Sequence, residues 1–257
     1  MFDRNDMGRF AYGLAAVWLG VIGLIAQDFA GVWQPLDNIG LGANRPLVAS
    51  IYALLFLAAG VAAWFQRSAA AGLAVLAVLH LLAMLGWISR IAYGGWTGFF
   101  EMLSLVIAGL VALARLQSPN PGWHRVIASG QGIFAICLLA FGLSHLMMSK
   151  ETAGMVPGWI PPNPMFWAYA TGVCYLLAGI AILTRVRDKL AAQLTVVMML
   201  SFNVFVWLPM LMDKPNAFNW AGNAITFAMA SAAWVIADSL TRPDAARSSA
   251  RMLADPG

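Results

Sequence analysis

Charged residues are scarce in this sequence. Lys, Arg, Asp and Glu together make up 10% of the 257 residues, whereas soluble domains carry roughly a quarter. Hydrophobic residues account for 61% of the chain, and the mean hydropathy is +0.76. The chain therefore lacks the polar side chains that cover the surface of a soluble domain. This composition excludes an ordinary water-soluble protein and predicts a protein embedded in a membrane.

Residue types that carry redox and metal chemistry are also few. The two cysteines, Cys137 and Cys174, form no Cys-x-x-Cys pair, which excludes a thiol–disulfide enzyme because such enzymes need paired thiols at an aqueous face. His80 and His145 lie at unequal depth in their apolar runs, which argues against a b-type haem. The sequence also lacks a His-x-x-x-His spacing and a Walker-type glycine-rich loop. We therefore expect neither a resident cofactor nor a metal site.

The apolar residues fall in eight runs, each close to the roughly 20 residues that cross a bilayer as a helix. The runs are Phe10–Ala26, Leu47–Phe65, Ala69–Ile88, Phe99–Ala114, Val126–Met148, Met165–Leu183, Ala191–Met212 and Trp220–Leu240. None alternates between apolar and polar residues as the strands of a membrane barrel do. The sequence therefore predicts an all-α polytopic membrane protein with eight transmembrane helices in contact with the lipid bilayer.

The basic residues predict how the chain is oriented. With both termini in the cytoplasm, eleven of the fifteen Lys and Arg residues lie on the inner side and four, Arg45, Arg90, Lys150 and Lys214, on the outer side. This bias follows the positive-inside rule. The net charge of +4 is thereby explained by topology and gives no support to nucleic-acid binding. We expect a bacterial plasma (inner) membrane protein with both termini cytoplasmic.

The chain also repeats itself. The matching pairs, in order, are "LLFLAAGVAA" at 54–63 with "VCYLLAGIAI" at 173–182, Trp87 with Trp207, and "WTG" at 96–98 with "WAG" at 220–222. These matches predict a tandem duplication, with a first four-helix repeat in residues 1–117 and a second in residues 118–242. An even helix count gives both repeats the same orientation, so they form a parallel repeat. Residues 243–257 are predicted to be a disordered cytoplasmic tail.

The second half resembles the DoxX family of small four-helix membrane proteins. The resemblance rests on Gly142-x-x-His145 near the end of one helix, on "VPGWIPPNPMFWAYATG" at 156–172, on "LLAGIAILTRVRDKLAA" at 176–192, and on Pro209 within the following helix. It implies a four-helix bundle for each half, and it extends to the first half only through the duplication.

The sequence departs from the family pattern at residues 207–210. Relatives often have His-x-Pro-Arg where this chain has Trp207-Leu208-Pro209-Met210, so a histidine and an arginine are missing. Members of the family are subunits linked to quinol oxidation or thiosulfate:quinone oxidoreduction, or partners of redox enzymes. The resemblance therefore implies a fold more strongly than it implies a reaction.

Polar side chains within the spans are the candidates for function, because each costs about 2–3 kcal/mol or more at bilayer depth unless it has a partner. The candidate binding residues are His145, Glu101, Arg90, Asn223, His80 and Asn203. Arg90 and Glu101 flank a short turn, where they either neutralise each other or bind an anionic or quinone head group. His80 is either a hydrogen-bonding strut between helices or a ligand-binding group. A midplane His80/Asn203 pair would favour transport.

His145 and the loop that follows it form the second candidate region. The loop at residues 156–164 is rich in Trp and Pro, and Trp159 and Pro161 are either an interfacial anchor that caps the bundle or a lid over an outward-facing pocket. We expect His145 to face the bundle interior beneath this loop, within reach of a polar group of the last helix such as Asn223.

Two functions are compatible with these residues. The first is a subunit or accessory protein of a quinone-linked redox system, which binds quinone or a redox-enzyme subunit without a cofactor of its own. The alternative is a carrier or assembly factor for a small hydrophobic molecule, which uses the cleft between the two repeats. The sequence leaves open whether the protein is an enzyme.

Overall fold

The protein is an all-helical bundle. The computed structural model describes residues 6–36, 40–117 and 121–240, and these ranges contain helices and turns but no strand. Eight helical spans are long and apolar enough to cross a membrane. They are α1 (Met7–Ala26), α2 (Arg45–Ala62), α3 (Ala69–Ile88), α4 (Trp96–Leu116), α5 (Pro121–Met147), α7 (Pro164–Thr184), α8 (Asp188–Phe202) with its continuation to Asp213, and α10 (Ala217–Ser239). They coincide with the eight predicted runs, so the predicted fold class is confirmed.

Shorter elements connect the spans. The 3-10 turns η2 (Gly31–Trp33) and η4 (Gly42–Asn44) lie between α1 and α2, and η5 (Ile91–Tyr93) lies between α3 and α4. The short helix α6 (Ser149–Met155) follows α5. A π turn, η6 (Asn203–Trp207), joins α8 to α9 (Leu208–Asp213) within one span. Neither α6 nor the π turn was predicted.

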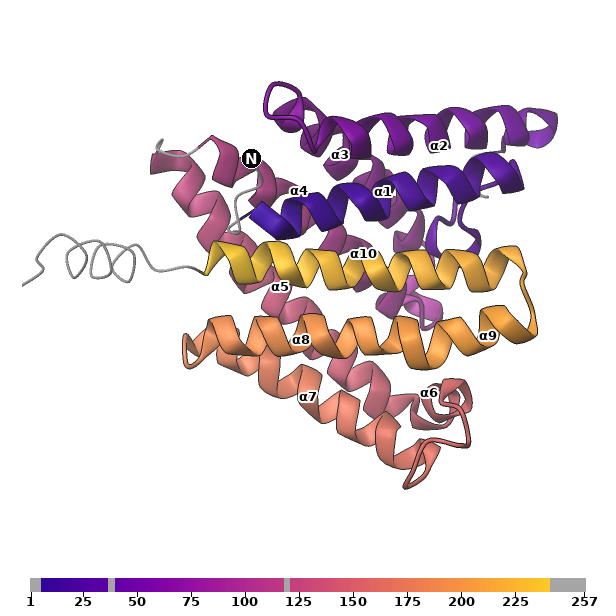
Figure 1. The fold of residues 1–257 in the computed structure, drawn as a ribbon, viewed down its shortest axis with the longest axis vertical. Coiled ribbons are helices and arrows are strands. Elements are labelled where there is room, and N and C mark those ends of the chain that lie inside the picture. The colour runs from indigo at the N-terminus through magenta and orange to yellow at the C-terminus, as the bar shows by residue number, and fades with distance from the viewer. Residues whose placement is uncertain (1–5, 37–39, 118–120, 241–257) are drawn as a thin grey trace, which may run out of the picture.

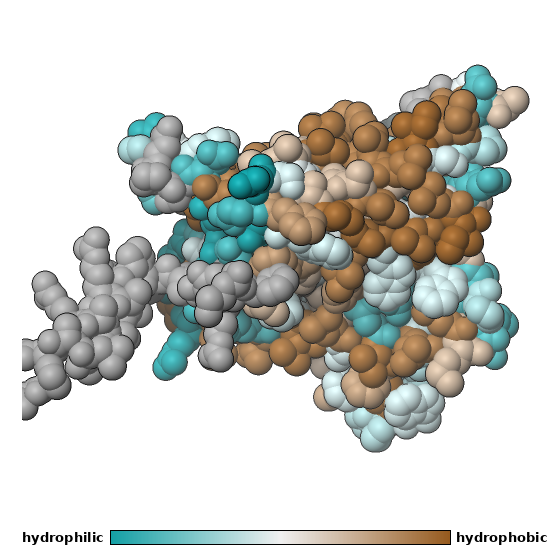
Figure 2. Space-filling view, turned by 45° about the horizontal axis from the view of Figure 1, so that its top comes forward, coloured by the Kyte–Doolittle hydropathy of each residue, from teal (hydrophilic) through white to brown (hydrophobic). Residues whose placement is uncertain are grey.

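The spans lie side by side, with α10 next to α1 near the centre and α7 and α8 at one side (Figure 1). α10 is the most buried span, and α7 and α8 are among the least buried. Figure 2 shows hydrophobic side chains over the middle of the helices and hydrophilic side chains gathered toward their ends. This distribution is the one expected for a bundle whose flanks contact hydrocarbon and whose ends contact water.

Glycines allow close approach of neighbouring helices. A Cβ atom at Gly13 of α1 would meet the backbone oxygen of Gly60 in α2. In the same way, a Cβ atom at Gly142 of α5 would meet the backbone oxygen of Gly172 in α7. Small residues at such crossings let backbones pack tightly in a membrane, where no hydrophobic effect drives helices together.

The helix contacts follow the same pattern in both halves. α1 packs on α2 and on α10, while α5 packs on α7 and on α4. The first helix of each predicted repeat thus contacts the second helix of its own repeat and the last helix of the other. The pattern is compatible with the predicted repeats 1–117 and 118–242, which remain a prediction. The predicted tail, residues 243–257, lies outside the described residues.

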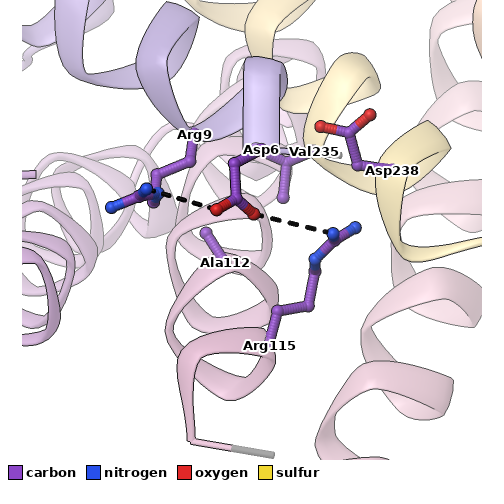
Figure 3. A pocket seen from close by; sticks show the side chains of 6 residues that line it. All are labelled: Asp6, Arg9, Ala112, Arg115, Val235 and Asp238. Carbon is purple, nitrogen blue, oxygen red and sulfur yellow. Dashed lines mark hydrogen bonds and ion pairs between the residues drawn. The ribbon is translucent and has the colours of Figure 1, made fainter. Parts of the chain in front are cut away.

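A charged cluster joins three helices at one end of the bundle (Figure 3). Asp6, which precedes α1, pairs with Arg9 at 3.2 Å and with Arg115 of α4 at 3.8 Å. The backbone N–H of Gly8 donates to Asp238 of α10 at 2.9 Å. The N-terminal end of α1 and the C-terminal end of α10 therefore lie on the same side of the bundle, as an even number of spans requires. Which side faces the cytoplasm remains a prediction.

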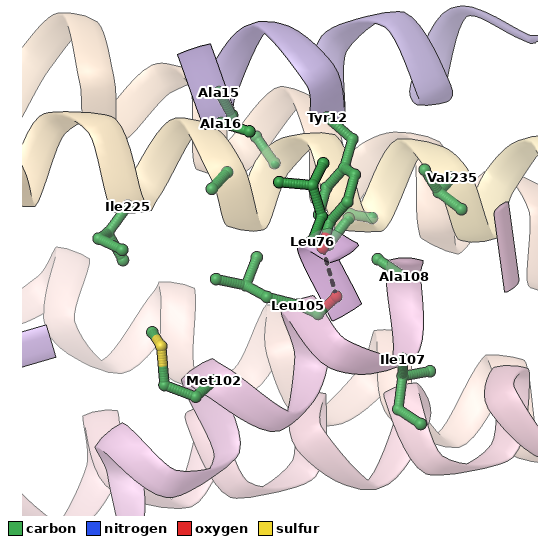
Figure 4. Packing of buried hydrophobic residues seen from close by; sticks show 14 of the residues in the cluster. Tyr12, Ala15, Ala16, Leu76, Met102, Leu105, Ile107, Ala108, Ile225 and Val235 are labelled. Carbon is green, nitrogen blue, oxygen red and sulfur yellow. Dashed lines mark hydrogen bonds between the residues drawn. The ribbon is translucent and has the colours of Figure 1, made fainter. Parts of the chain in front are cut away.

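The core of the first half is filled by large side chains around Tyr12. Figure 4 shows Tyr12 between Leu76 of α3 and Leu105 of α4, with its hydroxyl donating to the Leu105 carbonyl at 2.8 Å. Phe56 of α2 is fully buried in the same cluster. These contacts tie α1, α2, α3 and α4 into one packed unit.

Candidate functional site

A cavity of about 1090 Å³ lies between α7 and α8, and α4, α5 and α10 contribute to its inner wall. We call it the α7–α8 cavity. Leu177 of α7 and Leu194 and Val197 of α8 line it and are also exposed on the protein surface. The cavity therefore opens between these two helices on a flank that faces lipid in a membrane. Most of its wall is aliphatic or aromatic.

Four polar side chains gather at one end of this cavity, which we call the polar end: Glu101, His145, Thr171 and Tyr175. Glu101 comes from α4, His145 from the last turn of α5, and Thr171 and Tyr175 from successive turns of α7. Because residues four apart share one helix face, Thr171 and Tyr175 both reach the cavity. The helices thus bring together residues that lie up to 74 positions apart in the chain.

His145 is held in one orientation by Thr171. Its Nδ1 atom lies 2.8 Å from the Thr171 hydroxyl, which itself donates to the Trp167 carbonyl at 2.7 Å. Since the hydroxyl proton is directed to Trp167, the Thr171 oxygen accepts from Nδ1–H. The ring also lies within hydrogen-bonding reach of the Ala168 carbonyl, which likewise favours the tautomer with the proton on Nδ1 and leaves Nε2 as the acceptor. An acceptor nitrogen is therefore available to a molecule in the cavity.

Glu101 and Tyr175 complete the polar end. Glu101 is half-buried, and the Trp33 side chain is within hydrogen-bonding reach of its carboxylate. The Tyr175 ring packs edge-on against His145, with ring centroids 5.2 Å apart. Among the described residues, no ion pair involves Glu101, and the Tyr175 hydroxyl has no hydrogen-bond partner. The polar end thus offers a carboxylate, a hydroxyl and an imidazole acceptor.

Arg90 does not belong to this group, although the sequence suggested that it pairs with Glu101. No ion pair joins Arg90 to Glu101; the Arg90 guanidinium lies over the Trp87 ring, 5.6 Å from its centroid. The Gly95 N–H donates to the Arg90 carbonyl at 2.9 Å, so the turn folds back and leaves Glu101 to point into the cavity. The predicted pairing across the turn is therefore not formed.

Asn203 and Asn223 form a separate pair. Asn203 Nδ2 donates to the Asn223 backbone oxygen at 2.7 Å and to its Oδ1 atom at 3.0 Å. Asn223 was expected to lie near His145, but the hydrogen-bond partner of His145 is Thr171. The Asn pair instead fixes the π turn η6 against α10.

His80 is a core residue of the first half. It is 2% exposed, and its Nδ1 atom lies 2.8 Å from the Leu76 carbonyl and 3.0 Å from the Tyr12 hydroxyl. The Phe56 ring packs against it edge-on. The sequence left open whether His80 is a hydrogen-bonding strut between helices or a ligand-binding group, and this geometry favours the strut. His80 and Asn203 belong to different clusters, so the suggested midplane pair does not form.

The loop after His145 forms the wall at the polar end of the cavity. Trp159 lines the cavity, is 66% exposed, and packs against Phe205 of the π turn with ring centroids 6.4 Å apart. The Pro161 carbonyl accepts from Trp167 Nε1 at 2.9 Å, which ties the loop to α7. The loop therefore contributes to the wall of the cavity that His145 also lines; whether it acts as an anchor or as a lid remains a prediction.

Sequence reasoning missed Thr171, Tyr175 and Trp33. Each is an unremarkable residue for a membrane helix or its flank, and only the packing of α7 against α5 and α4 reveals their role. Within the described ranges, no group of three or more His, Cys, Asp or Glu side chains is placed to hold a metal ion.

Comparison with known proteins gives one match. Residues 134–237 match a family described as a domain of unknown function (DUF8561). The matched segment begins in α5 and ends in α10, so it includes His145, Thr171, Tyr175 and most of the cavity wall. No curated protein and no solved structure matches the chain.

Proposed function

We propose that this protein binds a lipophilic molecule with an uncharged hydrogen-bonding head group in the α7–α8 cavity. In this proposal it acts as a subunit or accessory protein of a quinone-linked redox system, without a cofactor of its own. The observation that carries the proposal is the group Glu101, His145 and Tyr175 at one end of a mostly apolar cavity. The resemblance of residues 142–192 to the DoxX family points to the same quinone-linked setting.

The dimensions and the opening of the cavity suit a membrane-soluble ligand. Its volume of about 1090 Å³ lies at the upper end of the roughly 300–1,000 Å³ of small-molecule sites. Because the cavity opens between α7 and α8, a ligand reaches it from the bilayer without crossing water. The apolar wall then accepts a hydrocarbon tail, and the polar end accepts the head group.

The charges at the polar end further restrict which head groups can bind. Among the described residues, Glu101 is the one acidic residue that lines the cavity, and neither Lys nor Arg lines this end. An anionic head group would therefore have no Lys or Arg partner in a medium of low dielectric constant, so the anionic option considered from the sequence is disfavoured. A quinol hydroxyl can donate to Glu101 or to His145 Nε2, and a quinone carbonyl can accept from the Tyr175 hydroxyl.

The alternative function, a carrier, has one observation in its favour. The cavity wall runs along α7 and α8 from Trp159 at one end to Arg187 at the other, which spans most of the length of these helices. A hydrophobic molecule could move along such a path. The path lies mainly among helices of the second repeat, however, and not in a cleft between the two repeats.

The proposal is tested by titrating a short-tailed quinone, in its oxidised and reduced forms, into the purified protein in lipid nanodiscs. Glu101→Leu should weaken binding of the quinol and Tyr175→Phe binding of the quinone, each about tenfold, the loss expected for one good hydrogen bond to a buried partner. Arg90→Gln is the matched control, because Arg90 lies at the same end of the bundle but outside the cavity. Equal binding by all four proteins, or no binding by the wild type, would refute the proposal.

His145→Ala separates binding from folding. We expect the variant to lose ligand affinity because it loses the Nε2 acceptor, while its thermal unfolding temperature changes little, since the ring is only partly buried beside an open cavity. A variant that expresses poorly and yet binds normally would make His145 a purely structural residue.

Cys174 provides an independent readout of cavity occupancy. It lines the cavity and is exposed, whereas Cys137 is fully buried. N-ethylmaleimide should therefore modify Cys174 alone in the folded protein, and a bound ligand should slow that modification. If saturating quinone does not slow the modification of Cys174, the ligand binds elsewhere.

A further inference from the structure

The end of the α7–α8 cavity opposite to the polar end carries a basic side chain. The turn between α7 and α8 contains four charged residues: Arg185, Arg187, Asp188 and Lys189. Arg185 donates to Gln131 Oε1 at 2.6 Å and lies 3.9 Å from Asp188. Asp188 also accepts from the backbone N–H of Lys189 at 2.9 Å. Two of the four charges in this turn therefore neutralise each other.

The contacts of Arg187 differ from those of Arg185. It is exposed and lines the cavity, and no hydrogen bond or ion pair connects its side chain to another residue in the described part of the chain. Its φ of 53° is in the left-handed region, where a residue with a side chain is strained. An arginine with five donors therefore stands at the mouth of an apolar cavity without an acceptor from the protein.

The walls that lead away from Arg187 are apolar. Arg187 directly precedes α8, and Leu190, Ala191 and Leu194 in the first two turns of α8 also line the cavity. Ala178 and Ala181 form the opposite wall on α7 and leave room between the helices. The acidic residue of the cavity, Glu101, lies at the polar end. This end of the cavity thus presents one cationic side chain, and an apolar groove leads away from it.

We propose that this end is a binding site for an anionic phospholipid. The phosphate is bound by the Arg187 guanidinium, whose planar fork matches phosphate oxygens, and one acyl chain lies in the groove between α7 and α8. Charge complementarity accounts for the anionic head group, and the apolar groove accounts for a lipid instead of a free anion. The phosphate contact at Arg187 is separate from the head-group contacts proposed at Glu101, although both molecules use the apolar wall of the same cavity.

The first half of the protein provides a matched control. Arg67 occupies the corresponding turn between α2 and α3 and is also exposed. There the two helices are in close contact, because Gly72 of α3 packs directly against Ala59 and Ala62 of α2, and Arg67 is not among the residues that line the α7–α8 cavity. Arg67 therefore has a similar charge at a similar place but no groove for a chain.

The test is native mass spectrometry of the protein after gentle extraction and exchange into micelles with equal amounts of phosphatidylglycerol and phosphatidylcholine. Both lipids carry the same acyl chains, and one is deuterated so that their masses differ. The wild type should retain phosphatidylglycerol about tenfold over phosphatidylcholine. Arg187→Gln should bring the ratio close to one, Arg187→Lys should keep part of the preference, and Arg67→Gln should leave it unchanged.

Several outcomes would overturn the proposal. These are a wild type without lipid preference, an Arg187→Gln variant that keeps the preference, and equal losses in Arg187→Gln and Arg67→Gln. Displacement of the lipid by inorganic phosphate alone would indicate an anion site without a lipid chain, which also contradicts it. If Arg187→Gln does not fold, Ala181→Phe narrows the groove without changing charge, and unchanged lipid retention in that variant refutes the proposal. The assay contains no quinone, so either proposal can fail alone.

Discussion

The two halves of the bundle differ in how they use the space between their second and third helices. In the first half, Tyr52 and Phe56 of α2 fill this space, and the Tyr52 hydroxyl donates to the Leu79 carbonyl of α3 at 2.6 Å. In the second half, the corresponding space between α7 and α8 is the cavity. The predicted repeat alignment places Thr171 opposite Tyr52 and Tyr175 opposite Phe56.

A difference in side-chain volume contributes to this contrast. Where Tyr52 spans the gap between α2 and α3, Thr171 is too short to reach α8, and its hydroxyl instead accepts from His145 of α5. The space that a ring fills in one half is thereby part of the cavity in the other. A membrane bundle can thus enlarge a cavity by losing one aromatic ring, without a new helix arrangement.

The largest expected contrast comes from removing these aligned side chains. Tyr52→Ala should lower the free energy of unfolding by about 3 kcal/mol or more, because it leaves a void in a packed core. Thr171→Ala should cost about 1 kcal/mol, since it removes a hydrogen bond beside an existing cavity. Reversible unfolding by sodium dodecyl sulfate in mixed micelles measures both values. Equal costs for the two variants would show that the halves are packed alike.

A smaller contrast is expected from added volume. Ala59 of α2 and Ala178 of α7 are aligned, yet Ala59 packs at the close α2–α3 contact and Ala178 lines the cavity. Ala59→Leu should therefore destabilise the protein by about 1–3 kcal/mol, the cost of overpacking, whereas Ala178→Leu should change stability by less than about 1 kcal/mol. The second variant should also weaken quinone binding. If Ala178→Leu proves the more damaging, the cavity is closed in the membrane.

The smallest expected effect concerns two tryptophans that pack on glycines. A Cβ atom at Gly98 would overlap the Trp87 ring, and one at Gly222 would overlap the Trp207 ring. Trp207 Nε1 donates to Thr226 at 2.7 Å, but the aligned residue in the first half is Met102, and the buried Trp87 Nε1 has no partner among the described residues.

Thr226→Val would make the second half resemble the first at this point. It should cost about 1 kcal/mol in the same unfolding assay, because the Trp207 N–H loses its acceptor. Thr226→Ser keeps the hydroxyl and serves as the control, with a smaller loss. If Thr226→Val leaves the free energy of unfolding unchanged, the Trp207 N–H must find another acceptor in the membrane-embedded protein. The Trp87 N–H would then be expected to find one as well.

The sequence was sufficient to predict the eight spans, because the length and apolarity of a membrane helix are local properties. It also singled out His145 and Glu101, which both line the cavity, since polar residues within spans are few. It could not identify Thr171 or Tyr175, because their role depends on which neighbour their helix face meets. Arg90 was misplaced because the turn at Gly94 and Gly95 directs it onto Trp87, a feature of backbone geometry and not of residue type.

The π turn η6 was missed for a related reason. The Leu208 N–H bonds to the Asn203 carbonyl, five residues earlier, directly before Pro209, whose ring cannot fit against a regular preceding turn. A proline within a span predicts a local irregularity, but not which kind. Here the extra residue directs Phe205 toward Trp159 and Asn203 toward Asn223.

The contact between α1 and α10 has a consequence for biosynthesis. Gly8 of α1 approaches the backbone of Val235 in α10 so closely that no Cβ atom fits between them, and its N–H is bound by Asp238. During translation, α1 is synthesised before α10, and the six other spans lie between them in the chain. The face of α1 that packs on α10 therefore has no partner until α10 has also entered the bilayer, and a chain truncated before α10 leaves that face of α1 uncovered.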